Sequence, residues 1–322
     1  MHDNFKQLGN SPTHGDGKWS SSAFRIRPSA SGVHLFDRGT GINVLLDEFS
    51  VPAADWSRAP RQVSVALTNR CDLACAYCYA PKSRATLDFS SVTGWLSELN
   101  ANGCLGVGFG GGEPTLYGRF AELCRYTTHK TELAVTFTTH AHHLDQTLSA
   151  ELRGNVHFIR VSMDGVGSTY EALRGRSFAV FRERIENVRS ITRFGINFVV
   201  NSRTLPDLDL AIEFATDVGA SQFLLLPEQS TRGRDGIDPE TAENLRHWVL
   251  NYRGALPLAI NESNAEGLPI CNPLPNESGL CGFAHIAASG VLKRNSFESD
   301  GVDIGAGSVM AALDILKSWE GE

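Results

Sequence analysis

Short apolar runs alternate with longer amphipathic stretches from residue 61 onward. The short runs are typical of strands, and the longer stretches repeat apolar residues at helical spacing. We predict strands near residues 63–68, 105–109, 133–138, 156–163, 196–201 and 222–226. We predict helices near residues 88–101, 118–129, 144–153, 179–193, 207–218 and 239–252. Repeated β-α units of this kind imply an α/β fold with a parallel sheet and right-handed crossovers.

Other patterns flank these units. Residues 1–22 are polar and predict a flexible tail. Residues 23–60 hold short alternating runs and a Gly-containing turn at 37–41, which predicts an N-terminal β-hairpin region. The β-α units fill residues 61–260, and residues 261–322 form a C-terminal extension. Six units are too few for a closed eight-stranded barrel.

Composition narrows the class of protein. The 322 residues suffice for one barrel-sized domain with short appendages, and 42% hydrophobic and 20% charged residues are ordinary for a globular protein. A net charge of -7 argues against a nucleic-acid binder, and no apolar run reaches the roughly twenty residues that span a bilayer. The N-terminus has no signal-peptide pattern, and seven cysteines then suit a reducing cytoplasm.

Three cysteines carry the strongest chemical signal. Cys71, Cys75 and Cys78 are spaced C-x3-C-x2-C, directly after the first strand of the β-α region. Three thiolates on one loop can hold three irons of a four-iron cluster and leave the fourth iron without a protein ligand. A structural zinc site is the alternative, but it requires four closed ligands, and no fourth Cys or His lies nearby.

Further motifs follow the cysteines in order. Tyr77 precedes the last cysteine, the sequence GGEP at 111–114 follows the second strand, and VSMDG at 161–165 ends the fourth. Over roughly residues 60–230 the chain resembles the radical S-adenosylmethionine (SAM) enzymes, and within them the peptide and natural-product maturases with SPASM or twitch-like extensions. The resemblance implies a partial (β/α)6 TIM-like barrel over residues 61–260. In such barrels the functional residues follow the C-terminal ends of the strands.

The resemblance also implies cofactors and their contacts. One [4Fe–4S] cluster would bind Cys71, Cys75 and Cys78, and SAM would chelate the fourth iron. Reductive cleavage of SAM would then give a 5′-deoxyadenosyl radical for C–H activation. The implied contacts with SAM are Gly111, Gly112 and Glu113 for its amino group, Ser162 for its ribose, Arg174 for its carboxylate, Tyr77 for its adenine, and Thr138 and Leu226 at two further strand ends.

The third strand ends in an unusual group of histidines. His140, His142 and His143 stand where many relatives have Thr-Asn-Gly. Neighbouring histidines on one loop cannot all face the same ion, and we expect no carboxylate in place to orient them. We therefore favour His140 as a hydrogen-bonding or proton-transfer group near the substrate over a metal site.

The other four cysteines do not suffice for a second cluster. Cys104 and Cys124 lie among apolar residues and predict buried thiols. Cys271 and Cys281 are the only cysteines of the C-terminal extension, and Asn295 stands where an auxiliary-cluster motif would have its second cysteine. We interpret residues 261–322 as a trimmed SPASM/twitch-like remnant, with a lid over the barrel mouth as the alternative.

The resemblance favours a ribosomally made precursor peptide as substrate. The N-terminal hairpin would dock this peptide as an added strand, or would only cover the edge of the barrel. A flavodoxin- or ferredoxin-type protein would supply electrons, and neither a nucleic acid nor a membrane is expected as a partner. Two alternatives stay open: an enzyme acting on a small-molecule natural-product intermediate, and a non-catalytic iron–sulfur redox sensor or scaffold.

Overall fold

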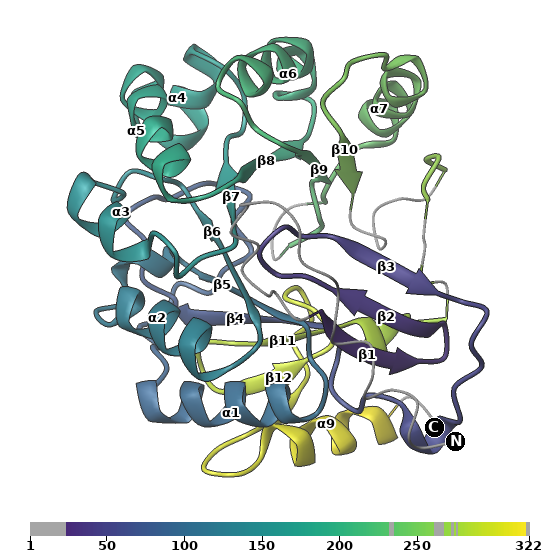
Figure 1. The fold of residues 1–322 in the computed structure, drawn as a ribbon. Helices are drawn as coiled ribbons and strands as arrows, with labels where there is room; N and C mark the ends of the chain where they lie inside the picture. The colour runs from purple at the N-terminus through teal and green to yellow at the C-terminus, as the bar shows by residue number, and fades with distance from the viewer. Residues whose placement is uncertain (1–23, 232–234, 261–266, 272–273, 275, 320–322) are drawn as a thin grey trace, which may run out of the picture.

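The computed structural model describes residues 24–231, 235–260, 267–271, 274 and 276–319. The tail predicted at 1–22 lies outside these residues. A curved, mostly parallel sheet forms the centre of the molecule, and helices lie along its outer side (Figure 1). The predicted α/β architecture is confirmed. Within the described residues, no helix is long and apolar enough to cross a membrane.

The central sheet has ten strands in the order β10-β9-β8-β7-β6-β5-β4-β11-β12-β13. The six predicted strands are β4 (Gln62–Thr68), β5 (Gly106–Gly111), β6 (Ala134–Thr139), β7 (Phe158–Ser162), β8 (Phe194–Val200) and β9 (Phe223–Pro227). Prediction missed β10 (Leu258–Ile260) and β11 (Phe283–Ile286), which pair in parallel with β9 and β4. It also missed β12 (Val291–Lys293) and β13 (Val302–Asp303), which continue the sheet in antiparallel fashion.

Six helices match the prediction within two residues at each end, and three further helices, at residues 168–174, 279–282 and 309–318, were not predicted. They are α1 (Phe89–Ala101), α2 (Phe120–Lys130), α3 (Gln146–Leu152), α4 (Ser168–Arg174), α5 (Phe178–Ile191), α6 (Leu208–Asp217), α7 (Pro239–Asn251), α8 (Gly279–Gly282) and α9 (Val309–Ser318). Short 3-10 turns lie at η2 (Ala53–Asp55), η3 (Pro114–Leu116) and η4 (Leu205–Asp207). Side chains of Asp88, Asp145 and Asp238 accept from backbone amides at the starts of α1, α3 and α7, which fixes where these helices begin.

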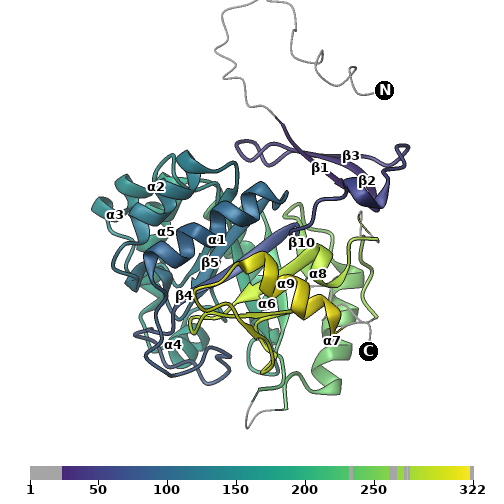
Figure 2. The same ribbon diagram turned by 90° about the horizontal axis from the view of Figure 1, so that it is seen from below.

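A separate three-stranded antiparallel sheet precedes the barrel. It consists of β1 (Arg25–Ser29), β2 (Gly32–Phe36) and β3 (Asn43–Leu46), so the hairpin expected around the 37–41 turn carries a third strand. Arg38 donates to the carbonyls of Thr131 and Leu133, immediately before β6 (2.9 and 3.1 Å). The sheet therefore lies against the end of the barrel where the parallel strands begin (Figure 2).

The C-terminal extension is built into the barrel wall. Its strand β11 pairs with β4, and its helix α9 packs on α1, where the hydroxyl of Ser308 donates to Glu98 (2.6 Å). Beyond β12, the ring of Phe297 lies 4.9 Å from that of Tyr79, beside the cysteine loop. The extension thus adds strands to the sheet and also touches the loop that carries the cysteines.

The two faces of the parallel strands differ in chemistry. Outward positions such as Val107, Phe137 and Ile159 are fully or almost fully buried against the helices. Many inward positions are small or polar, and they line a cavity of about 830 Å³ together with Val199, Leu224 and Leu226. Among them are Ser64, Gly108, Gly110, Thr136, Thr138, Arg160, Ser162 and Asn197. Branched apolar side chains usually fill a TIM-barrel interior, so this barrel is hollow where others are packed.

Candidate functional site

The cavity brings the predicted site residues together. Every residue proposed above for the cluster, for SAM or for the substrate lines it. These residues are Cys71, Cys75, Tyr77, Cys78, Gly111, Gly112, Glu113, Thr138, His140, Ser162, Arg174 and Leu226. They come from the C-terminal ends of β4, β5, β6, β7 and β9 and from the loops that follow, except for Arg174, which is the last residue of α4. The structure therefore brings the predicted site residues together around one cavity, and it shows which partners they have within the protein.

The cysteine loop joins β4 to the segment that precedes α1. Cys71, Cys75 and Cys78 are all free and partly buried. Cys71 accepts a hydrogen bond from the amide of Leu73 (3.4 Å), and burial raises the pKa of its thiol. Three sulfur donors on one short loop beside a cavity fit a four-iron cluster with one iron left open to another ligand.

Gly111 and Gly112 are needed for packing of the chain itself. Gly111 has φ +121°, and a Cβ there would lie 2.3 Å from the carbonyl oxygen of Thr68. A Cβ on Gly112 would lie 2.2 Å from the carbonyl oxygen of Arg70. The amide of Gly112 donates to Thr68 at 2.7 Å. We expected these glycines to admit a ligand, but the structure shows that they first admit the backbone of the cysteine loop.

Glu113 is held from several sides inside the protein. Its side chain is 1% exposed and accepts from the amide and hydroxyl of Thr115 (3.2 and 2.7 Å). It also accepts from the hydroxyl of Thr139 (2.8 Å) and from the amide of His140 (3.0 Å). The carboxylate therefore ties the end of β5 to the end of β6, in addition to any contact with a cofactor.

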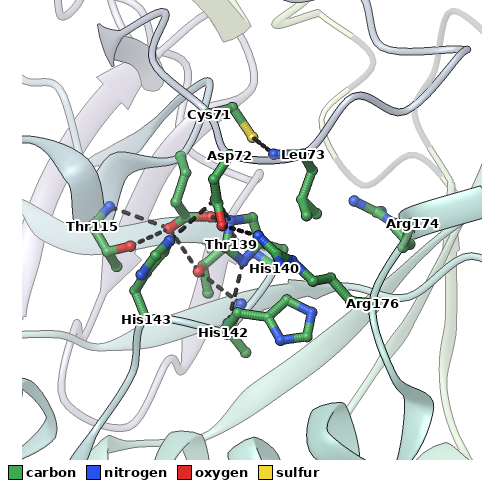
Figure 3. A network of polar contacts seen from close by, with 12 residues as sticks. Cys71, Asp72, Leu73, Thr115, Thr139, His140, His142, His143, Arg174 and Arg176 are labelled. Atoms are coloured by element: carbon green, nitrogen blue, oxygen red, sulfur yellow. Dashed lines mark hydrogen bonds and ion pairs between the residues drawn. The ribbon is translucent and has the colours of Figure 1, made fainter. Parts of the chain in front are cut away.

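A carboxylate does orient the histidines, contrary to expectation. Asp72, beside Cys71, lies 3.0 Å from Nε2 of His140 and 3.1 Å from Nε2 of His143, and Arg176 also donates to it (2.7 Å; Figure 3). Burial alone would raise the pKa of Asp72, but the two histidines hold it well below its ordinary value. Donor atoms of Cys71, Asp72 and His140 lie within 4.8 Å of one another.

The side chain of His142 does not contact Asp72, although its backbone amide donates to Nδ1 of His140 (3.2 Å). Its Nε2 lies 3.0 Å from the hydroxyl of Tyr170, and burial together with the charge of His140 lowers its pKa to about 4. His142 and His143 do not line the cavity, whereas His140 does. The histidines therefore separate into one that borders the cavity and two that support it.

Asp164 is the main residue that sequence reasoning missed. It is 1% exposed at the end of β7, and the hydroxyl of Tyr77 donates to it at 2.5 Å. Arg174 also donates to Asp164, as does the amide of Val199 (2.7 Å). Burial and the nearby Asp164 carboxylate raise the pKa of Tyr77. The sequence did contain a sign of its importance, because Asp164 belongs to the VSMDG motif at the end of a predicted strand.

Arg174 is not a surface residue, and in this structure it pairs with a carboxylate of the protein. We expected it to bind the SAM carboxylate, but its partner in the protein is Asp164, and its side chain is 10% exposed. Its Nη1 lies 3.7 Å from Sγ of Cys75. Arg174 therefore connects the cysteine loop to β7, and a SAM carboxylate would have to share it with Asp164.

Comparisons with known proteins define the class. Residues 65–211 match the family model of the Radical SAM superfamily, so this segment is similar to radical SAM enzymes and the predicted resemblance is confirmed. Enzymes of this superfamily use a [4Fe–4S] cluster and SAM, and the predicted cofactors are confirmed at that level.

Particular relatives follow from the same comparisons. The mycofactocin maturase MftC of Mycolicibacterium smegmatis is 29% identical over 208 residues, 60% of this chain and 52% of that protein. The sporulation killing factor maturation protein SkfB of Bacillus subtilis is 26% identical over 238 residues, 70% of this chain and 57% of that protein. The chain thus spans about half the length of the curated relatives it matches. The predicted resemblance to maturases is confirmed.

Solved structures confirm the fold. Streptococcus suis SuiB bound to SAM superposes with a TM-score of 0.71, covering 93% of this chain and 87% of SuiB at 14% identity. At that identity the similarity concerns the fold alone. It extends over the N-terminal and C-terminal parts of the described chain as well as over the barrel.

Proposed function

We propose that this chain binds one [4Fe–4S] cluster through Cys71, Cys75 and Cys78 and cleaves SAM reductively. The observation that supports this most is that one cavity joins the three cysteines to all eight residues expected to contact SAM. When bound, the reduced cluster supplies the electron that splits SAM into methionine and a 5′-deoxyadenosyl radical able to abstract hydrogen from carbon.

The residues around the cavity would position these groups. Asp164 holds Tyr77 and Arg174 against the cysteine loop, and Glu113 fixes the β5 and β6 ends that border it. Gly111, Gly112, Thr138, Ser162 and Leu226 would bind SAM along the strand ends. The remaining cavity, toward the start of the strands, would receive the substrate and exclude water from the reaction.

The substrate we propose is a ribosomally made precursor peptide. Relatives at 26–29% identity are named as a mycofactocin maturase, a sporulation killing factor maturation protein and a PqqA peptide cyclase. SuiB, with its precursor peptide SuiA bound, superposes with a TM-score of 0.72. In the present chain β3 is an edge strand with a partly exposed face, where Val44 is 38% exposed. An extended peptide could add to this edge as a further strand.

The proposal is tested with protein purified without oxygen. About four irons per chain and broad absorbance near 400 nm are expected for one thiolate-bound cluster. Dithionite and SAM should then give 5′-deoxyadenosine. Alanine at Cys71, Cys75 or Cys78 should remove both the iron and the product, whereas alanine at the exposed Cys271 is the matched control. Iron without 5′-deoxyadenosine would support a non-catalytic sensor or scaffold instead.

A small-molecule substrate is the second candidate. An AdoMet-dependent heme synthase of Methanosarcina barkeri is 26% identical over 205 residues, 60% of this chain and 58% of that protein. Turnover of a candidate precursor peptide, measured with the full chain and with Val44→Asp at the β3 edge, separates the two candidates. If the enzyme acts on a peptide, this variant should bind the peptide more weakly than the parent does. If it acts on a small molecule, the substitution should leave its activity on that molecule unchanged. We place the enzyme in the cytoplasm, with a flavodoxin- or ferredoxin-type donor.

A further inference from the structure

Arg160 differs from the other buried arginines of this protein. Arg27 has the carboxylate of Glu277 and three backbone carbonyls, Arg174 has Asp164, and Arg25 has Glu132 and Asn100. Arg160 forms no ion pair within the described residues. Its Nη2 donates to the amide oxygen of Gln222, and its buried Nη1 has no acceptor there.

The barrel makes room for this unpaired guanidinium. Arg160 is on β7, and the residue beside it on β8 is Gly195. A Cβ on Gly195 would lie 3.1 Å from Nη1 of Arg160 and 3.1 Å from the ring of Phe158. The guanidinium carbon lies 5.0 Å from the centre of that ring. The position is therefore shaped for a guanidinium, and it borders the cavity.

An unpaired arginine at such a place carries a free-energy cost. Burial lowers the pKa of Arg160 to about 10, so the group is still protonated at neutral pH. Removing a guanidinium from water without an anionic partner is unfavourable, and a carboxylate offers two acceptor oxygens in the matching geometry. A second buried polar atom without a partner, Oδ1 of Asn197, lies on the next inward position of β8.

We propose that Arg160 binds a carboxylate of the substrate inside the barrel. This inference rests on the proposed function, because it takes the cavity as the substrate site. The carboxylate would come from an Asp or Glu side chain of a peptide or from an acidic small molecule. Asn197, on the neighbouring strand, would accept a hydrogen bond through Oδ1 from a donor group of the substrate near that carboxylate.

The test measures equilibrium binding to the full chain, with no turnover. Two probe pairs are used: N-acetylated, amidated Ala-Glu-Ala against Ala-Gln-Ala, and glutarate against glutaramide. Saturation-transfer NMR should show at least tenfold tighter binding for a carboxylate than for its amide counterpart. The pair that shows this preference identifies the source, peptide or small molecule. Arg160→Met should remove the preference, whereas Arg182→Met, which removes an exposed arginine of α5, should retain it.

A second variant tests the same inference if Arg160→Met does not fold. Gln222→Glu places a carboxylate at the oxygen that Arg160 already contacts, so it should satisfy the guanidinium internally. We expect the free energy of unfolding of this variant to be at least that of the parent. The ratio of amide to carboxylate dissociation constants should fall at least tenfold. Equal binding of both members of each pair to the parent, or an unchanged preference in Gln222→Glu, would overturn the inference. Absence of 5′-deoxyadenosine from the parent would instead refute the proposed function.

Discussion

Replacing Asp164 by asparagine should weaken the structure that holds the cysteine loop. The carboxylate accepts from Tyr77, Arg174 and the amide of Val199. An asparagine has nearly the same shape and can still accept from Val199. It has no charge to offer Arg174, and its amide group would face a donor. Arg174 would then be a buried charge without its partner.

The structure sets the size of the effect. Removing one partner of a buried ion pair costs about 3–5 kcal/mol. Asp164 is 1% exposed, but the Arg174 side chain is 10% exposed and also lies near Cys75, so we expect the lower end, about 3 kcal/mol. Tyr77→Phe removes only one hydrogen bond to a charged acceptor, for which about 1.5 kcal/mol is expected.

Urea unfolding of the metal-free chain measures this loss, with an unchanged slope showing that the unfolded state is comparable. Iron per chain after reconstitution is the second measurement, and it should fall because Tyr77 lies between two of the cysteines. Asp209→Asn is the matched control, since Asp209 accepts from Trp248 at the surface (2.7 Å). If Asp164→Asn lay within about 1 kcal/mol of the parent and bound the same iron, the assigned role of Asp164 would be wrong.

Three further changes probe the site and its support. Gly112→Ala should displace the cysteine loop and lower bound iron, because its Cβ would lie 2.2 Å from a carbonyl oxygen, whereas Gly110→Ala has no atom within 4 Å and should retain iron. The Cys271→Ala, Cys281→Ala double variant should keep about four irons, and eight irons in the parent would reveal a second cluster. Arg27→Met should lower the free energy of unfolding by about 3–5 kcal/mol in urea; a neutral result would contradict its role in joining β1 to the barrel.

The β-α core was predictable because its signals are local. Strands β4 to β9 and the helices between them, apart from α4, follow from apolar periodicity, and aspartates such as Asp88 and Asp145 mark helix starts within one residue. Strands β10 and β11 were missed because they are short and their pairing partners lie elsewhere in the chain. Each has only three or four residues, and β11 finds its partner β4 more than two hundred residues earlier in the chain. No local pattern records such a pairing.

The candidate site likewise combines features that local sequence predicts with contacts that it does not. Motifs identified the residues around the cavity, since these follow strand ends at recognisable spacing. Their partners could not be inferred, because each contact spans the fold: Asp72 reaches histidines 68 and 71 residues away, and Tyr77 reaches Asp164. The expectation that no carboxylate orients the histidines failed for this reason. A carboxylate next to a cysteine ligand gives no sign of which strand end it will face.

The sequence also contains a sign of the hollow barrel, at the positions that alternate with the apolar ones. Along β5 the outward residues Val107 and Phe109 are almost fully buried, while the inward residues Gly108 and Gly110 have no side chain at all. Glycine inside a strand weakens it, because it packs nothing and loses more conformational freedom on folding. Repetition of glycine on one face of a central strand therefore works against stability. What these glycines provide is the open cavity beside the cysteines, because bulkier side chains at the same positions would occupy the space that a cofactor and a substrate need.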